Sequence, residues 1–303
     1  MSGARRVSRD SWDAAVGEAA QGYLSASFAE LNSRKCREVH YLLCGSAGII
    51  LGEREGWLLS PFSAPYGGFT GHDSGAAAML ADYCRAKRLG CEITLPASVY
   101  GAKTLKEAGE LLNARFSLSA VDANYHYSYP GTDFESLLGV TGRKKLRHAL
   151  RENPDIREGG PELLSEAYAI IERNRSERGY PLKMSLEEMR LTAGIIPTDC
   201  FVVRIGEDGP AASAIVHRTM PDAAQVVYWG NTQGDDRAYG ANFPIMHALV
   251  GAVYCHYRRQ PGMRLLDTGP ASDRGLILPG LAQFKERMGC LRSDKLTFKM
   301  LAE

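Results

Sequence analysis

The side chains best suited to chemistry gather at residues 143–151 of this 303-residue chain. The segment RKKLRHALR holds five basic residues in nine. On a helix, Lys144, Arg147, His148 and Arg151 would share one face. Such a face could bind a sugar phosphate, a nucleotide-linked acceptor or tRNA. The alternative is a solvated face paired with the acidic residues that follow it, Glu152, Asp155 and Glu158.

Other chemically suggestive patterns fail on geometry, and we predict no metal site. Cys36, His40 and Cys44 have the spacing of metal ligands, but on a strand i and i+4 lie about 13 Å apart. The segment GVTGRK at 139–144 lacks the spacing and the hydroxyl residue of a phosphate loop. Cys255 and His256 are helical neighbours and point in different directions, so they form no nucleophile and base pair.

Composition excludes several classes of protein. With 36 basic and 35 acidic residues the net charge is +1, so no global field attracts DNA or an acidic membrane. Seven scattered cysteines predict free thiols in a reducing compartment. No apolar run of signal-peptide length precedes Asp13, which favours a cytoplasmic protein. Residues 238–257 lack formal charges, yet their apolar residues have helical spacing, which predicts a buried amphipathic helix and no transmembrane segment.

The elements that must position these side chains occur twice in the same order. Residues 11–33 have helical periodicity, followed by strands at 38–44, 47–52 and 56–59, a glycine-bearing loop, a helix at 76–89, a strand at 91–96, a helix at 103–113 and a strand at 115–127. The second half has helices at 133–152, 161–177 and 185–195, strands at 200–205, 211–219 and 224–229, a glycine loop, a helix at 243–259, a strand at 263–267, a helix at 280–288 and a strand at 293–300. We therefore predict an α/β chain with mixed sheets, divided into residues 1–130 and 131–303.

Several motifs resemble the Fem-type tandem transferases of the Gcn5-related N-acetyltransferase (GNAT) fold. They are RKKLRHALR with the helix after it, the turn YWGNT, the strand end LLDTGP and the helix GLAQFKERMGC. The loop SPFSAPYGG in the first half resembles a loop of the same group. The likeness covers most of residues 38–300. It implies two GNAT-like modules in tandem, with the acceptor bound mainly by the first and the donor by the second.

The resemblance also implies a donor site. Backbone amides of the strand Gln225–Trp229, including Val227, would hold the acyl carbonyl where this strand splays from the strand at 263–267. The loop after it, formed by Arg237, Tyr239, Gly240 and Asn242, partly matches a pyrophosphate loop. Gly240 would let the backbone approach a phosphate, and the next helix would present its N-terminus. In the alternative, Asn242 only caps that helix and Arg237 is solvated.

Three residues would perform the chemistry that the resemblance implies. Lys285 would offset negative charge on the tetrahedral intermediate, Asp267 would act as an acid, a base or the partner of the lysine, and Tyr228 would protonate the leaving group. Each has a structural alternative. Lys285 can extend along an apolar face into water, Asp267 can form a turn, and Tyr228 can belong to the core.

The predicted function is therefore acyl transfer from acyl-CoA or aminoacyl-tRNA to an amine or hydroxyl, on a cell-wall precursor, a sugar or a small amino compound. Transfer would be direct, because no serine or cysteine lies in a recognisable nucleophile motif. Tyr66, Gly68 and His72 would line the acceptor cleft. We expect no tightly bound cofactor and a monomer or weak dimer, and we favour coenzyme A over tRNA. The alternatives are a tRNA-dependent aminoacyltransferase of the peptidoglycan-bridge type and a catalytically silent binding protein.

Overall fold

The computed structural model describes residues 3–180, 182–234, 238–240 and 242–302, and it has a mixed α/β architecture. The chain forms two compact units. Unit 1 comprises residues 1–124, 270–278 and 293–303, and unit 2 comprises residues 125–269 and 279–292. The predicted division at residue 130 differs from these units at residues 125–130 and in the two C-terminal segments of unit 1. Residues 293–303 group there because the last strand pairs with a strand of that unit, Met300 lying opposite Cys91. Residues 270–278 group there because Ala271 N donates to Ala123 O and Ser272 Oγ donates to Asp122.

Unit 1 is built on an antiparallel meander that continues into a β-α-β crossover. The strands are β1 (Arg5–Val7), β2 (Glu38–Cys44), β3 (Ala47–Arg54), β4 (Trp57–Ser60), β5 (Phe69–Gly71), β6 (Gly90–Ala97), the first part of β7 (Ser117–Ser128), the two-residue strands β13 (Ser272–Asp273) and β14 (Leu276–Ile277), and most of β15 (Leu291–Met300). The helices are α1 (Arg9–Val16), α2 (Ala26–Leu31), α3 (Ala76–Lys87) and α4 (Ala102–Asn113). β4 and β6, which precede and follow α3 in the chain, pair in parallel from Trp57 opposite Gly90 to Ser60 opposite Ile93.

The alternation of side chains along β2 explains why this sheet is covered on both faces. Tyr41 and Leu43 pack with Trp12 of α1. Leu42 and Cys44, which point the other way, pack with α3 and α4. Both sets are apolar, so burying the two faces gives unit 1 its core.

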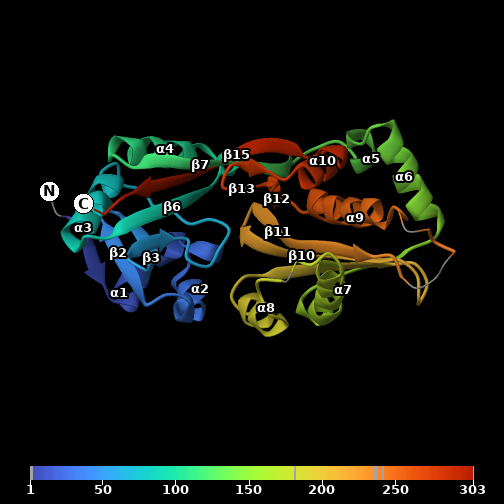
Figure 1. Ribbon diagram of the computed structural model, residues 1–303, viewed down its shortest axis with the longest axis horizontal. Helices are drawn as coiled ribbons and strands as arrows, with labels where there is room; N and C mark the ends of the chain where they lie inside the picture. The colour runs from blue at the N-terminus through green and yellow to red at the C-terminus, as the bar shows by residue number, and fades with distance from the viewer. Residues whose placement is uncertain (1–2, 181, 235–237, 241, 303) are drawn as a thin grey trace. The chain divides into compact units, whose positions relative to one another are not determined.

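Unit 2 repeats the order of a meander followed by a parallel crossover. Its strands are β8 (Asp155–Gly159), β9 (Thr198–Arg204), β10 (Ala211–Met220), β11 (Ala223–Thr232) and β12 (Leu265–Pro270), with the second part of β7. Its helices are α5 (Phe134–Leu137), α6 (Val140–Arg151), α7 (Leu164–Glu177), α8 (Leu186–Ala193), α9 (Ile245–Arg259) and α10 (Pro279–Arg287). In Figure 1, α7 and α8 lie on one side of β10 and β11, and α9 and α10 lie on the other.

The structure corrects some of the predicted elements. The single helix predicted at 11–33 is wrong: α1 ends at Val16, and short 3-10 turns at 17–19 and 22–24 separate it from α2. Gly22 has a left-handed φ of 54°, which a helix cannot contain. The short strands β1, β5 and β8 escaped the prediction because each spans only three to five residues.

The uncharged segment 238–257 contains most of α9, whose buried residues include Leu249, Val253 and Tyr257. This confirms a buried amphipathic helix. In the described part of the chain, no helix is long and apolar enough to cross a membrane. All seven cysteines are free thiols, as predicted.

One buried histidine should make the protein sensitive to acid. His217 on β10 is 1% exposed, and its burial lowers the pKa of the imidazole to about 4. Since an unfolded histidine titrates near ~6.5, the folded state binds fewer protons, and stability is lost as pH falls from about 6.5 towards 4. We expect this one group to remove about 2 kcal/mol of unfolding free energy between pH 7 and pH 5.

Urea unfolding at the two pH values measures this loss. His217→Gln should shrink the difference between pH 7 and pH 5. Equal pH dependence in the parent and His217→Gln would show that another group causes it.

Candidate active site

Two neighbouring strands of unit 2 part after a short parallel pairing. β11 pairs with β12 only from Ala223 opposite Leu265 to Gln225 opposite Asp267. β11 then continues to Thr232 and β12 to Pro270. Beyond Gln225, this edge of β11 therefore has backbone groups that β12 does not pair. The parting lies where the sequence analysis places a splay.

A β-bulge marks the same point of β11. On the β10 side, Val216 lies opposite Val226 and Ile215 lies opposite Tyr228, so Val227 is the extra residue. A bulge bends and twists the strand that carries it, and bulges are common beside active sites. The bend therefore falls immediately after the last residue that pairs with β12, at the residue predicted to present its amide to an acyl carbonyl.

Lys285 on α10 is buried beside the parting, with 2% exposure. Its Nζ donates hydrogen bonds to the carbonyl oxygens of Thr268 at 2.7 Å and Gly269 at 2.6 Å. Consecutive carbonyls of an extended strand point in opposite directions. Here Gly269 has a φ of 79°, which breaks the extended geometry and accompanies their convergence on one ammonium. The Tyr125 ring lies 5.8 Å from Nζ. The alternative in which Lys285 extends into water is therefore wrong.

Asp267 is also 2% exposed and has partners for both carboxylate oxygens. Oδ1 accepts from the Gly269 amide at 2.8 Å, which is the turn-forming bond that the sequence analysis offered as an alternative. Oδ2 accepts from Gln225 Nε2 at 2.8 Å, across the last register pair of β11 and β12. These two bonds fix the carboxylate where the strands part. Oδ1 forms the turn, and Oδ2 faces β11.

His126 on β7 was missed in the sequence analysis, although it is 5% exposed and lies close to Asp267. Burial lowers the pKa of His126, and the Asp267 carboxylate acts in the opposite direction. The sequence gave no sign that His126 lies near Asp267, because β7 and β12 are far apart in the chain.

Tyr228 points to the face of the sheet that α7 covers. It packs against the apolar cluster of α7 and α8, and burial raises the pKa of its hydroxyl. The next residue, Trp229, lies on the opposite face and contacts Phe284 of α10, with ring centroids 5.5 Å apart. Tyr228 is thus on the face of β11 opposite the helix that carries Lys285. Its role in protonating a leaving group remains a prediction.

The predicted pyrophosphate loop and the predicted basic helix share one open pocket. Tyr239, Gly240 and Asn242 line it together with Lys145 and His148 of α6. Aromatic contacts join the two segments: Phe243 lies 5.2 Å from His148 and 5.2 Å from Tyr239 between ring centroids. Sequence analysis predicted each segment separately and gave no indication that they meet. Arg237 lies outside the described residues.

Two details of the loop bear on phosphate binding. A Cβ added to Gly240 would meet no atom within 4 Å, so the backbone there faces open space. The residue that caps α9 is Pro244, without a side-chain hydrogen bond, so the alternative that Asn242 caps this helix is wrong. The loop therefore offers an accessible backbone near a helix N-terminus, the arrangement that favours phosphate.

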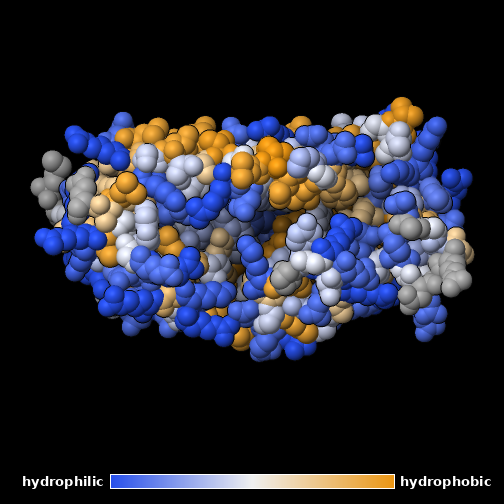
Figure 2. Space-filling view, in the orientation of Figure 1, coloured by the Kyte–Doolittle hydropathy of each residue, from blue (hydrophilic) through white to orange (hydrophobic). Residues whose placement is uncertain are grey.

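Three other basic residues of α6 lie on a different groove. Lys144, Arg147 and Arg151 line it with Leu150, whereas His148 belongs to the pocket described above. Arg147 Nε donates to Glu135 Oε1 at 2.6 Å, and the surface over α6 is mostly hydrophilic (Figure 2). The ion-pair partner of Arg147 is therefore Glu135, which precedes the helix, and not one of the acidic residues predicted after it.

The three predicted acceptor residues of unit 1 occupy different environments. Tyr66 is 2% exposed and packs between Tyr23 and Tyr100, at centroid distances of 5.3 and 5.2 Å. Gly68 lines a small pocket behind the loop at residues 60–68, with its amide donating to Ser60 Oγ. His72 is exposed and accepts a hydrogen bond from Lys106 at 2.6 Å. Their roles in acceptor binding remain predictions.

Sequence comparison gives no matching family model and no matching curated protein. Solved structures do match. FemX has a TM-score of 0.64 at 12% identity, over 99% of this chain and 97% of FemX. The C-terminal domain of a protein assigned as a lysylphosphatidylglycerol synthetase, from Agrobacterium fabrum, has a TM-score of 0.62 at 12% identity, over 96% of this chain and 92% of that domain.

A conserved protein of unknown function from Bacteroides thetaiotaomicron has a TM-score of 0.60 at 12% identity, over 99% of this chain and 100% of its own. At this identity the likeness shows the fold. The Fem-like fold predicted from the sequence motifs is confirmed.

Proposed function

We propose that this chain, which has the fold of FemX, is an acyltransferase whose donor lies along the parted edge of β11. The observation that carries the proposal is the coincidence of three features at Gln225–Val227: the end of the β12 pairing, the bulge, and the carboxylate of Asp267. Unpaired strand amides at such a point can donate to an acyl oxygen as it becomes an oxyanion.

The proposed reaction is a direct transfer. An amine or hydroxyl of the acceptor attacks the acyl carbonyl, its proton passes to Asp267, and the donor's leaving group departs. Lys285 stabilises the negative charge that develops on the carbonyl oxygen. Cys290 accepts a hydrogen bond from Thr268 Oγ1, at an oxygen–sulfur distance of 3.8 Å, and burial raises the pKa of its thiol. A thiol held in its neutral form is a poor nucleophile, which supports transfer without a cysteine intermediate.

The proposed donor is an acyl-CoA. Its phosphates would bind in the pocket of Tyr239, Gly240 and Asn242, where Lys145 and His148 supply positive charge or hydrogen-bond donors. β11 precedes this loop in the chain, and the donor would extend from the strand edge to the pocket with its phosphate end in the pocket. The acceptor would be an amine or hydroxyl on a cell-wall precursor, a sugar or a small amino compound.

A second candidate donor is an aminoacyl-tRNA, favoured by the separate groove on α6. Lys144, Arg147 and Arg151 line that groove, and an extended basic surface suits a polyphosphate backbone. Charge reversal at Lys144 and Arg151 should then abolish salt-dependent tRNA binding. If it leaves transfer unchanged, the acyl-CoA donor is favoured.

The test of the proposed function is calorimetric titration with acetyl-CoA and with longer acyl-CoAs. Gly240→Val should weaken binding by tenfold or more, or about 1.4 kcal/mol, because the added side chain fills the space that backbone and phosphate would share. The variant should keep the fold, since no protein atom lies within 4 Å of the new Cβ.

The matched control is Gly109→Val on α4, another exposed glycine whose added Cβ meets no atom within 4 Å. It should leave the donor affinity unchanged. Failure of both acyl-CoA and aminoacyl-tRNA to bind the parent protein at millimolar and micromolar concentrations, respectively, would overturn the proposed function in favour of a catalytically silent binding protein.

A further inference from the structure

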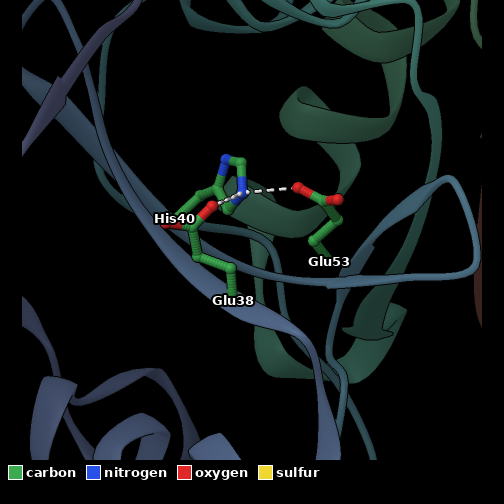
Figure 3. A group of neighbouring side chains, drawn as sticks. All are labelled: Glu38, His40 and Glu53. Atoms are coloured by element: carbon green, nitrogen blue, oxygen red, sulfur yellow. Dashed lines mark hydrogen bonds and ion pairs between the residues drawn. The ribbon is translucent and has the colours of Figure 1, made fainter.

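Three side chains of unit 1 that the proposed acyl transfer does not use converge on one point. Glu38 and His40 lie on β2 and Glu53 lies on β3 (Figure 3). His40 Nε2 is 3.1 Å from Glu53 Oε2 and 3.5 Å from Glu38 Oε2. The three potential ligand atoms lie within 4.8 Å of one another.

The register of the sheet brings two negative charges together. Glu38 lies directly opposite Glu53 in the antiparallel pair of β2 and β3. Like charges in directly opposite positions destabilise a sheet. His40, two residues after Glu38, projects from the same face. A cation at the point where the three side chains meet would turn the repulsion of the carboxylates into a stabilising interaction.

Each of the three side chains is also held by a second partner on its outer atom. Arg6 bonds Glu38 Oε1 at 2.5 Å, and Arg37 bonds Glu53 Oε1 at 3.2 Å. The arginines therefore leave the two Oε2 atoms facing His40. On the far side of the imidazole, Nδ1 lies 3.0 Å from the Tyr83 hydroxyl of α3.

The contacts on the outer atoms of Glu38, His40 and Glu53 are of the kind that usually surround metal ligands. Metal-binding histidines generally hydrogen-bond through their second ring nitrogen, and ligating carboxylates are themselves hydrogen-bonded. In a tetrahedral site with bonds of about 2.1 Å, neighbouring ligand atoms are about 3.4 Å apart. The distances of 3.1 and 3.5 Å around His40 Nε2 are close to that separation.

We propose that Glu38 Oε2, His40 Nε2 and Glu53 Oε2 bind a divalent transition-metal cation. Two carboxylates balance its charge, and an imidazole ligand favours zinc, iron or nickel over magnesium and calcium. The side chain of Glu38 is 49% exposed, so water can complete the coordination. The ion would join β2 and β3 directly, and through Arg6 and Tyr83 it would link them to β1 and α3.

The test uses the full-length protein after treatment with a chelator, titrated with Zn²⁺ by calorimetry. The parent should bind one equivalent and melt at a higher temperature with the metal. His40→Ala should weaken binding at least 100-fold. Because His40 is buried, Glu38→Gln provides a second variant at a half-exposed position, and it should weaken binding at least tenfold.

Two further variants separate a built site from incidental binding. Tyr83→Phe removes only the outer hydrogen bond of His40, and it should weaken binding about 10-fold or more. His72→Ala removes an exposed histidine of the same unit and should leave the affinity for Zn²⁺ as in the parent. Absence of one-equivalent binding at about 100 µM Zn²⁺, or binding that survives both His40→Ala and Glu38→Gln, would overturn the proposal.

Discussion

Replacing Asp267 with asparagine should lower the turnover of acyl transfer by at least 100-fold and leave the fold intact. The asparagine Oδ1 can still accept from the Gly269 amide. Its Nδ2 would face Gln225, whose side-chain amide can turn to present Oε1. That oxygen is buried and has no hydrogen-bond partner within the described part of the chain. The substitution therefore removes the charge and the proton-accepting ability of Asp267, and the rotation exchanges one unpaired atom of Gln225, Oε1, for the other, Nε2.

The measurement compares turnover and melting temperature of the parent and Asp267→Asn with the same donor and acceptor. Asp122→Asn is the matched control, because Asp122 is also buried and accepts hydrogen bonds from Ser272 Oγ at 2.6 Å and Gly275 N at 3.0 Å. It should keep turnover within threefold of the parent. If Asp267→Asn keeps more than a tenth of the parent's turnover, Asp267 forms the turn and does not accept the proton.

Lys285→Met should lower turnover by about 10² to 10³, or roughly 2.7 to 4 kcal/mol of transition-state stabilisation, with little change in donor affinity. Methionine keeps most of the volume of the side chain and removes the charge. The same variant loses the bonds to Thr268 and Gly269, so its melting temperature should also fall. Turnover is therefore measured well below the melting temperature of the variant.

Two comparisons separate the charge of Lys285 from its packing. Lys295→Met also removes a lysine that donates to a carbonyl, that of Pro65 at 3.0 Å, and should leave turnover within threefold. Lys285→Arg keeps the charge and should retain more activity than Lys285→Met. Equal activity of the parent and the folded Lys285→Met variant would make Lys285 a residue that only fixes the end of β12.

Periodicity in the sequence was sufficient to predict most of the elements. The meanders at β2–β4 and β9–β11 and the crossovers through α3 and α9 follow from alternating and helical apolar patterns bounded by glycine. The prediction failed where a local signal was weak. Gly22 interrupts the predicted N-terminal helix, and β1 and β5 are too short to show a period.

The composition of the sites was less predictable than the fold. Strand spacing argues against a metal site of Cys36, His40 and Cys44, but it gives no sign of the partners of His40, which include Glu53 on the next strand and Tyr83 on α3. Likewise, the carboxylate that influences the pKa of His126, that of Asp267, is about 140 residues away in sequence. A buried lysine also looks the same in sequence as an exposed one. These contacts depend on register and long-range packing, which no local pattern encodes.

Amide hydrogen exchange of β11 with and without acyl-CoA reports on the parted edge itself, where the donor is proposed to bind. Saturating donor should slow exchange in Val226–Trp229 and at the start of α9, and Gly240→Val should raise the donor concentration that this requires. Unchanged exchange of these amides, while other segments of the chain become protected by the bound donor, would contradict the account.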